Sequence, residues 1–140
     1  MDFKCEKCVI VLDSALPQGL AANTAAILGI TLGKTLPEAV GPDVQDGSGN
    51  PHPGIIAFPV PILRGDGSVL RALLEKLRTP PFSGLFAADF SDLAQGCKTY
   101  GEFQAKMVAA PEESLQYLGL AVCGEKKLVN KLTGSLPLLR

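Results

Sequence analysis

The spacing of apolar residues predicts strands that alternate with helices along the chain. Residues 7–13, KCVIVLD, are apolar on both faces, which is typical of a central strand covered on two sides. Further strands are expected at residues 55–63, 85–90 and 117–123, and helices at about 17–36, from 66 or 68 to about 78, 99–109 and 125–132. This alternation predicts a layered α/β fold with a largely parallel sheet, built as a single domain over residues 1–140.

Local signals support several of these elements. The second helix carries leucines at the i, i+3, i+4 and i+7 positions from Leu70, which form one buried stripe. Thr99 and Glu102 have the spacing of a capping box. Two prolines inside residues 55–63 push that strand toward an edge of the sheet. Residues 41–54, GPDVQDGSGNPHPG, contain turn signals and are expected to form a hairpin-like excursion or a surface loop.

The balance of charge argues against a nucleic-acid partner. The chain holds 13 basic and 14 acidic residues, a net charge of −1, whereas binding to a phosphate backbone needs a strongly basic face. No apolar run approaches the length that spans a bilayer, and the first residues lack the pattern of a signal peptide. We therefore expect a cytoplasmic protein with no membrane partner. Its hydrophobic content of 46% is sufficient for a well-packed core.

Four cysteines raise the questions of metal binding and redox chemistry. Cys5 and Cys8 form a C-x-x-C pair, whereas Cys97 and Cys123 are single. A structural zinc site usually needs two close pairs, and the one histidine of the chain, His52, has no partner at ligand spacing. A redox pair usually lies at the start of a helix, but this pair precedes a strand. Ordinary reduced thiols are the simpler interpretation, and we expect neither a metal nor another cofactor.

Motifs spread along the chain resemble two related protein groups. LPQGLAANTAAILG, VGPDV, HPGI and KLTGSLPLLR resemble the family known as domain of unknown function 2000. The order of strands and helices, from KCVIVLD to YLGLAVCGEKKLVNKLTGSLPLLR, is similar to that of the type-two peptidyl-tRNA hydrolases. The resemblance covers nearly the whole chain. It implies a three-layer α/β/α sandwich with a four-stranded mixed sheet, in which the first and fourth strands are central.

The resemblance to the hydrolases implies one catalytic residue but leaves another unmatched. The hydrolases carry an aspartate at the end of the third strand, and Asp89 matches it. Their lysine in the loop before the first helix falls at residues 17–20, PQGL, where no residue is a cationic donor. A histidine that the hydrolases often place further along that helix has no counterpart either. The fold can therefore be inherited without the chemistry.

The turn between the first strand and the first helix is the candidate ligand site. Ligands of open α/β sheets tend to bind beyond the carboxyl ends of the strands. The start of the helix offers free N–H groups that favour an anion or a polar carbonyl. The segment does not have the glycine pattern of a phosphate-binding loop. The side chains expected near this point are Asp13, Ser14, Gln18, Asn23 and Asp89.

Each candidate also has a purely structural interpretation. Asp13 is either a general base with Asp89 as its partner, or a strand-end carboxylate that binds the backbone of its own turn. Asn23 is suited to orient a substrate amide, but a buried amide needs a hydrogen bond in any case. His52 lies in a loop, where a role in ligand binding or catalysis is allowed and a solvated side chain is favoured.

Two functions from different classes follow. The first, which the pattern favours, is the binding of a small polar ligand or a peptide without catalysis, by a homodimer that uses its apolar strand and helix faces. The second is hydrolysis of an ester or amide bond, with Asp89 and Asp13 in acid–base roles and helix N–H groups that polarise a carbonyl. The enzyme hypothesis predicts a pocket lined by Asp13, Asn23 and Asp89, in which the pKa of at least one carboxylate is strongly shifted.

Overall fold

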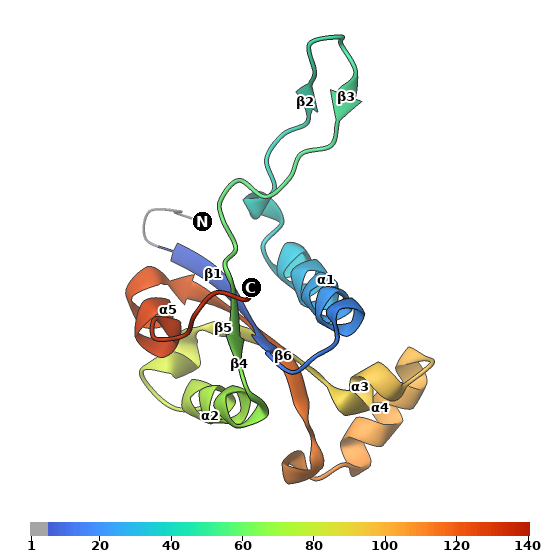
Figure 1. Ribbon diagram of the computed structural model, residues 1–140, viewed down its shortest axis with the longest axis vertical. Coiled ribbons are helices and arrows are strands. Elements are labelled where there is room, and N and C mark those ends of the chain that lie inside the picture. Colours follow the sequence, from blue (N-terminus) through green and yellow to red (C-terminus); the bar gives the residue numbers. More distant parts are fainter. Residues whose placement is uncertain (1–5) are drawn as a thin grey trace.

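The computed structural model describes residues 6–140, which form a four-stranded sheet with helices on both faces and a projecting hairpin (Figure 1). The strands are β1 (Glu6–Asp13), β2 (Val44–Gln45), β3 (Pro51–His52), β4 (Ile62–Gly65), β5 (Phe86–Ser91) and β6 (Tyr117–Glu125). The helices are α1 (Gln18–Thr35), α2 (Gly67–Leu77), α3 (Asp92–Gly96), α4 (Tyr100–Ala109) and α5 (Lys126–Thr133). Short 3₁₀ helices lie between them at η1 (Pro37–Ala39), η2 (Phe82–Gly84) and η3 (Glu112–Ser114).

The sheet has the strand order β4-β1-β6-β5, so β1 and β6 are central. The pair β1–β4 is parallel, whereas β6 runs antiparallel to both β1 and β5. The predicted mixed sheet is confirmed, but fewer of its strands are parallel than the alternation of elements predicted. The reason is that Ser91, at the end of β5, pairs with Tyr117, at the start of β6. The helices between these strands therefore return the chain to the same end of the sheet at which β5 finished, and β6 runs back in the opposite direction.

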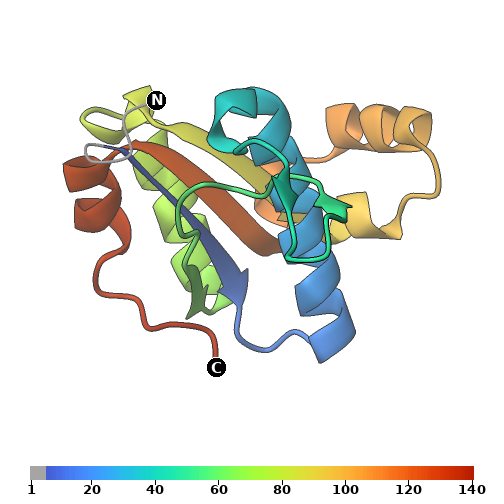
Figure 2. The same ribbon diagram turned by 90° about the horizontal axis from the view of Figure 1, so that it is seen from above.

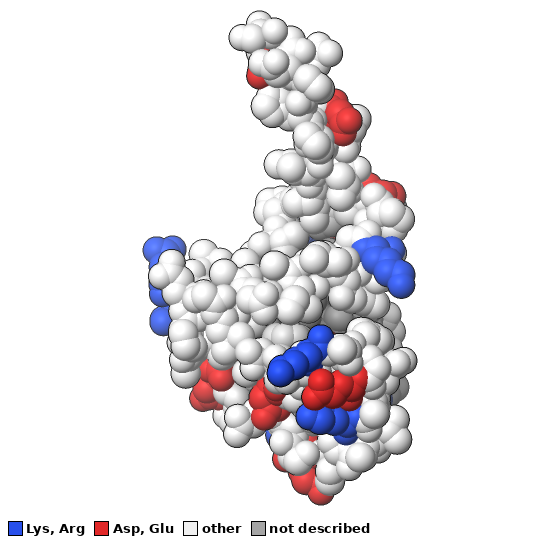
Figure 3. Space-filling model, turned by 90° about the vertical axis from the view of Figure 1, so that its right-hand side faces the viewer, with Lys and Arg blue, Asp and Glu red and all other residues white. Residues whose placement is uncertain are grey.

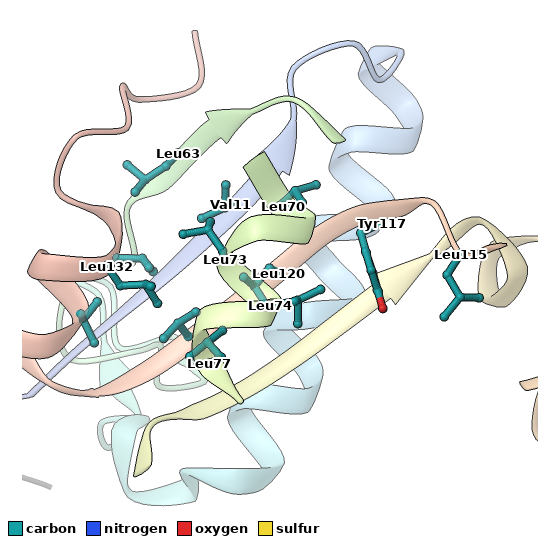
Figure 4. Close-up of a cluster of buried hydrophobic side chains, with 13 residues drawn as sticks. Val11, Leu63, Leu70, Leu73, Leu74, Leu77, Leu115, Tyr117, Leu120 and Leu132 are labelled. Atoms are coloured by element: carbon teal, nitrogen blue, oxygen red, sulfur yellow. The ribbon is translucent and has the colours of Figure 1, made fainter. Parts of the chain in front are cut away.

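Helices cover both faces of the sheet and create two cores. Figure 2 shows α1 against one face, and α2 with α5 against the other. On the α1 face, Leu12 of β1 packs in the same cluster as Leu28. On the α2 face, Val11 and Leu120 pack with the leucine stripe that begins at Leu70 (Figure 4), so the predicted stripe is confirmed. Because successive strand residues face opposite sides, this alternation shows which face each β1 side chain occupies.

The edge strand β4 is shorter than predicted. The expected strand covered residues 55–63, whereas β4 spans Ile62–Gly65. The two prolines just before it cannot donate the hydrogen bonds of a strand ladder, and regular pairing begins only after them. The predicted edge position is confirmed. Leu63 forms a β-bridge with Leu138, so the last residues of the chain cover the outer side of β4.

Two of the cysteines form a disulfide. The register of β1 and β6 places Cys8 opposite Cys123, with their Cα atoms 4.2 Å apart, and the two sulfur atoms are bonded. The expectation of reduced thiols is therefore wrong for this pair, because pairing across the sheet joins residues that are far apart in the sequence. Cys97 keeps its thiol, which donates a hydrogen bond to the Leu93 carbonyl (Sγ···O 3.2 Å). Cys5 lies outside the described residues.

Residues 41–57 form an arm that projects from the body beyond the end of α1 (Figure 1). At the neck of the arm, the Gly41 amide donates a hydrogen bond to the Ile55 carbonyl (N···O 2.9 Å). Further out, β2 and β3 pair antiparallel. The hairpin that the turn residues predicted is therefore present, and His52 belongs to it.

The surface carries charges of both signs. On the side of the body that Figure 3 displays, Lys and Arg are interspersed with Asp and Glu, and no large patch of one sign is visible. Within residues 6–140, none of the helices combines the length and the apolar character that crossing a bilayer requires. The same stretch contains no cluster of three or more potential metal ligands.

Candidate functional site

The four strands of the sheet all have one end at the same side of the molecule, which we call the Asp13 end of the sheet. β1 ends at Asp13 beside Gly65, the last residue of β4, and β5 ends at Ser91 beside Tyr117, the first residue of β6. α2 begins directly after β4, with Asp66 as its N-cap. The Asp13 end therefore holds the carboxyl ends of the parallel pair, the position at which α/β sheets usually bind ligands.

A polar cleft with a volume of about 400 Å³ opens at this end, and we call it the Asp13 cleft. It is lined by Asp13, Gly67, Ser68, Arg71, Glu113, Leu115, Gln116, Tyr117 and Leu118. The lining contains two carboxylates and one guanidinium. The cleft is therefore suited to ligands that make hydrogen bonds and ion pairs.

Asp13 lies half-buried in this cleft. Its side chain follows Val11 by two positions and so lies on the α2 face of the sheet. Oδ1 accepts a hydrogen bond from the Ala15 amide at 2.9 Å, which is the turn-forming role that the sequence offered as an alternative. An ionised carboxylate has about four lone-pair sites, so this bond uses only part of the accepting capacity of Asp13.

Arg71 of α2 connects this helix to the segment around Leu115 that forms the opposite wall of the cleft. Its guanidinium donates hydrogen bonds of 2.5 Å to the Leu115 carbonyl and to Glu112 Oε2, and lies 5.3 Å from the centre of the Tyr117 ring. Arg78 reaches the other Glu112 oxygen at 3.3 Å. Desolvation opposes the ionisation of Glu112, but its bonds to the two guanidinium groups prevail and lower its pKa. Arg71 and Arg78 thus share one ionised carboxylate, which matches only one of their two positive charges.

A β-bulge directs Tyr117 toward the same region. The register between β5 and β6 shifts after Phe90, which leaves Leu118 as an extra residue in β6. Tyr117 thereby lies on the α2 face, at one end of the leucine cluster, and is only 5% exposed (Figure 4). Desolvation, with the nearby negative charges of Glu112 and Asp89, raises the pKa of Tyr117. The phenol is therefore a neutral hydrogen-bonding group at physiological pH.

Asp89 lies outside the Asp13 cleft. It pairs with Leu120 of β6, and strand geometry places its Cα about 12 Å from that of Asp13. Asp89 instead borders a separate cleft of about 440 Å³ whose lining includes Ile27 and Thr31 of α1, although its own side chain lies on the α2 face of the sheet. Desolvation raises the pKa of Asp89, against the opposing effect of the Arg78 charge. The structure thus contains one carboxylate with a raised pKa, that of Asp89. It does not bring Asp89 and Asp13 together in one cleft.

The other predicted site residues also lie away from the Asp13 cleft. Ser14, Gln18 and Asn23 are exposed, and α1 packs on the sheet face opposite to that of the two carboxylates. His52 lies on the arm, with Nε2 3.0 Å from Asp46 Oδ2. Of the predicted set, Asp13 alone lines this cleft.

Sequence reasoning missed the other eight residues of the cleft, and the polar side chains among them are Ser68, Arg71, Glu113, Gln116 and Tyr117. A signal for Arg71 existed, because a residue next to Leu70 and three before Leu74 borders the buried stripe of α2. Ser68 was considered only as an alternative cap for that helix. Tyr117 carried no signal of this kind, because the direction of its side chain depends on the bulge.

Comparison with known proteins places the chain in a family. Residues 6–140 match the family described as "Protein of unknown function (DUF2000)". The chain belongs to the DUF2000 family. A solved structure similar to this DUF2000 protein is that of Atu0240 from Agrobacterium tumefaciens strain C58, described as a protein of unknown function. The two chains are 17% identical with a TM-score of 0.85, over 95% of this chain and 96% of the other. This likeness shows that the two proteins share a fold. A comparison with curated proteins found no match to the DUF2000 chain.

Proposed function

We propose that this DUF2000 protein binds a small polar ligand or a peptide that presents an amine to the Asp13 cleft, without catalysis. The observation that carries the proposal is a concave polar site at the carboxyl ends of β1 and β4 that contains the carboxylates of Asp13 and Glu113. Arg71 and Arg78 share Glu112, so the cleft and this ion-pair network together hold three carboxylates and two guanidinium groups, and a net negative charge remains. An ammonium group or an N–H donor therefore matches the cleft better than an anion does.

The rest of the lining suits a ligand with a polar end and a small apolar part. Leu115 and Leu118 add apolar surface, and the Tyr117 ring closes one wall. Ligand sites commonly combine apolar walls with a few polar groups that set the orientation of the ligand. The amino end of a peptide has this combination of features.

Titration of isotope-labelled protein, followed by NMR, tests the proposal. Glycylglycine and methylammonium are expected to shift the amide signals of Ala15, Ser68 and Leu118, whereas acetate leaves them in place. Asp13→Asn keeps an oxygen that accepts the Ala15 hydrogen bond but removes the charge. It is expected to weaken the binding of glycylglycine roughly 10-fold or more, because hydrogen bonds to charged groups are the stronger ones.

Asp43→Asn is the matched control. Asp43 also accepts a hydrogen bond from a backbone amide, that of Gly54 at 2.9 Å, but it lies on the arm. Its replacement is expected to leave the affinity for glycylglycine unchanged. Equal effects of Asp13→Asn and Asp43→Asn, or shifts of the same amides with acetate, would show that the Asp13 carboxylate does not recognise an amine.

A second candidate function is hydrolysis of an ester or amide bond at Asp89. Two observations favour it: desolvation raises the pKa of Asp89, as suits a general acid or base, and Arg78 lies near enough for its positive charge to act on the same carboxylate. The test is cleavage of peptidyl-tRNA by the wild-type protein, Asp89→Asn and Asp13→Asn. Turnover that Asp89→Asn abolishes and Asp13→Asn retains supports the enzyme, and absence of turnover in the wild type contradicts it.

A further inference from the structure

The arm is held in shape by its own hydrogen bonds rather than by a core. Asp46 Oδ1 accepts hydrogen bonds from the amides of Ser48 and Asn50, at 2.9 and 3.0 Å, and Oδ2 lies 3.0 Å from His52 Nε2. Every residue from 42 to 53 is exposed. An isolated two-stranded hairpin is at best marginally stable in water, so a ribbon of this kind gains stability from a surface on which to pack.

The arm also presents apolar side chains to solvent. Val44 is 59% exposed and Ile55 is 79% exposed. Of the eight large apolar residues that are exposed within residues 6–140, four lie between positions 40 and 56. This concentration in a small part of the chain is typical of an interaction surface rather than of scattered surface residues.

An apolar groove of about 270 Å³ lies beside the base of the arm. Gly29 of α1 forms one wall, Ile10 and Ile62 of the sheet form the floor, and none of the lining residues is charged. From Gln18 to Gly33, α1 has no charged residue, so this part of the helix lacks the charged outer face that is typical of a helix at the protein surface. In a single chain its outer side is open, with Ile30 at 73% exposure.

The accessible surface of a single chain is larger than its mass predicts. The chain exposes 8505 Å². A compact monomer of 14.7 kDa exposes about 6,900 Å². The excess of about 1,600 Å² is twice the roughly 800 Å² that each partner buries in a standard interface. A ribbon that projects from an otherwise compact body accounts for an excess of this kind, and a partner that covers the ribbon would remove it.

The charges of the arm and of the groove rim are complementary. The arm contains two acidic residues, Asp43 and Asp46, and no Lys or Arg, and Figure 3 shows red but no blue atoms on it. Lys34 lies in the last turn of α1, next to the groove. Lys7 and Lys126 line a small neighbouring cleft together with Glu6, and Glu38 of η1 lies next to groove residue Ala39. The rim therefore has three basic and two acidic residues, a net charge of +1, whereas the arm has a charge of −2, so the two surfaces carry opposite net charge.

We propose that this chain forms a twofold-symmetric homodimer in which the arm of each copy lies in the α1 groove of the other. Residues 42–53 of the arm point away from their own body (Figure 1), and only Ile56, at the base of the arm, lines the groove of its own chain. A second copy supplies an arm and a groove together, and the reciprocal contact closes the assembly. The interface is separate from the Asp13 cleft and does not depend on the ligand proposed for it.

Sedimentation velocity over a range of concentrations tests the dimer with the full chain. The wild type is expected to sediment as a dimer. Ile55→Asp and Val44→Asp place a charge on apolar arm residues that are exposed in the single chain, so each should raise the dimer dissociation constant at least about 10-fold without unfolding the body. Val108→Asp is the matched control, because Val108 is 90% exposed on α4 and lies outside the arm and the groove.

A mixing experiment distinguishes this exchange of arms from any other dimer. Gly29→Glu adds bulk and negative charge inside the groove, and a Cβ at Gly29 meets no atom within 4 Å, so the helix accepts it. Ile55→Asp and Gly29→Glu are each expected to be monomeric alone, whereas their mixture regains one intact arm–groove contact and forms heterodimers. A monomeric wild type, a wild-type dimer that resists both arm substitutions, or a mixture that stays monomeric would overturn the proposal.

Discussion

At the scale of single residues, Gly119 determines how closely α1 approaches the sheet. It lies in the central strand β6, under α1. A Cβ at this position would lie 2.7 Å from Thr24 Cγ2, 2.9 Å from Leu12 Cδ2 and 3.0 Å from Leu28 Cδ1. These distances are shorter than van der Waals contact allows, so α1 packs on β6 because this residue has no side chain.

We predict that Gly119→Ala destabilises the fold. The added methyl group must displace α1 or its core side chains, at a cost of about 1–3 kcal/mol in the free energy of unfolding. Urea unfolding followed by circular dichroism measures the loss. Gly101→Ala, in α4, is the control, because a Cβ there meets no atom within 4 Å and should cause no loss. Equal stability of Gly119→Ala and the wild type would contradict the close packing of α1 on β6.

Single residues also mark the limit of what the sequence could predict about the site. Asp13 was placed correctly at the end of a strand, because an apolar run that stops at an acidic residue followed by a turn is a local pattern. Its neighbours in the cleft, Arg71 and Tyr117, come from distant elements. Arg71 and Tyr117 come together because of the direction of α2 and the bulge at Leu118, and the local sequence predicts neither of these features.

At the scale of elements, the arm depends on one carboxylate. Asp46 binds His52 and the amides of Asn50 and Ser48, and these hydrogen bonds lower the pKa of Asp46 from 3.8 to about 2. A lowered pKa in the folded state means that the bonds stabilise the arm at pH values above 3.8. Their contribution is lost as the pH falls through about 2, because the protonated acid no longer accepts these bonds equally well.

We predict that Asp46→Ala loosens the arm and leaves the body intact. The amides of Ser48 and Asn50 lose their acceptor, so their hydrogen exchange should become faster, while the amides of α2 keep their protection. In the wild type, the same two amides should lose protection between about pH 4 and pH 2. Exchange rates that do not change in the variant would show that other contacts hold the arm.

Among the elements, those with a complete local pattern were predicted well. β1 is apolar on both faces and α2 has a leucine stripe, and both lie within a residue or two of their expected limits. α4 begins at the predicted capping box, where Thr99 Oγ1 accepts from the Glu102 amide at 3.1 Å. The five-residue α3 was missed, because so short a helix has no periodicity to detect.

At the scale of the whole molecule, the Cys8–Cys123 bond links two strands that are 115 positions apart in the sequence. A cross-link of this span greatly restricts the unfolded chain, and such links typically contribute about 2–5 kcal/mol to stability. We predict that a reductant lowers the midpoint of urea unfolding. Cys8→Ala should be insensitive to the reductant, and Cys97→Ala should respond like the wild type.

The same pairing shows what sequence reasoning could not supply at this scale. The layers and the central position of β1 were predicted, because they follow from which faces are apolar. The antiparallel direction of β6 and the register that opposes Cys8 to Cys123 are long-range properties. They depend on where the chain re-enters the sheet after α4, which local patterns do not specify.

The hydrogen bond between Gly41 and Ile55 at the neck has a consequence for the evolution of the fold. Because the chain enters and leaves the arm at adjacent points, an insertion or deletion there does not change the path of the backbone through the sheet. Descendants of this gene are free to lengthen, shorten or discard the projecting ribbon. The proposed dimer contact and the proposed ligand cleft are therefore able to diverge separately within one lineage.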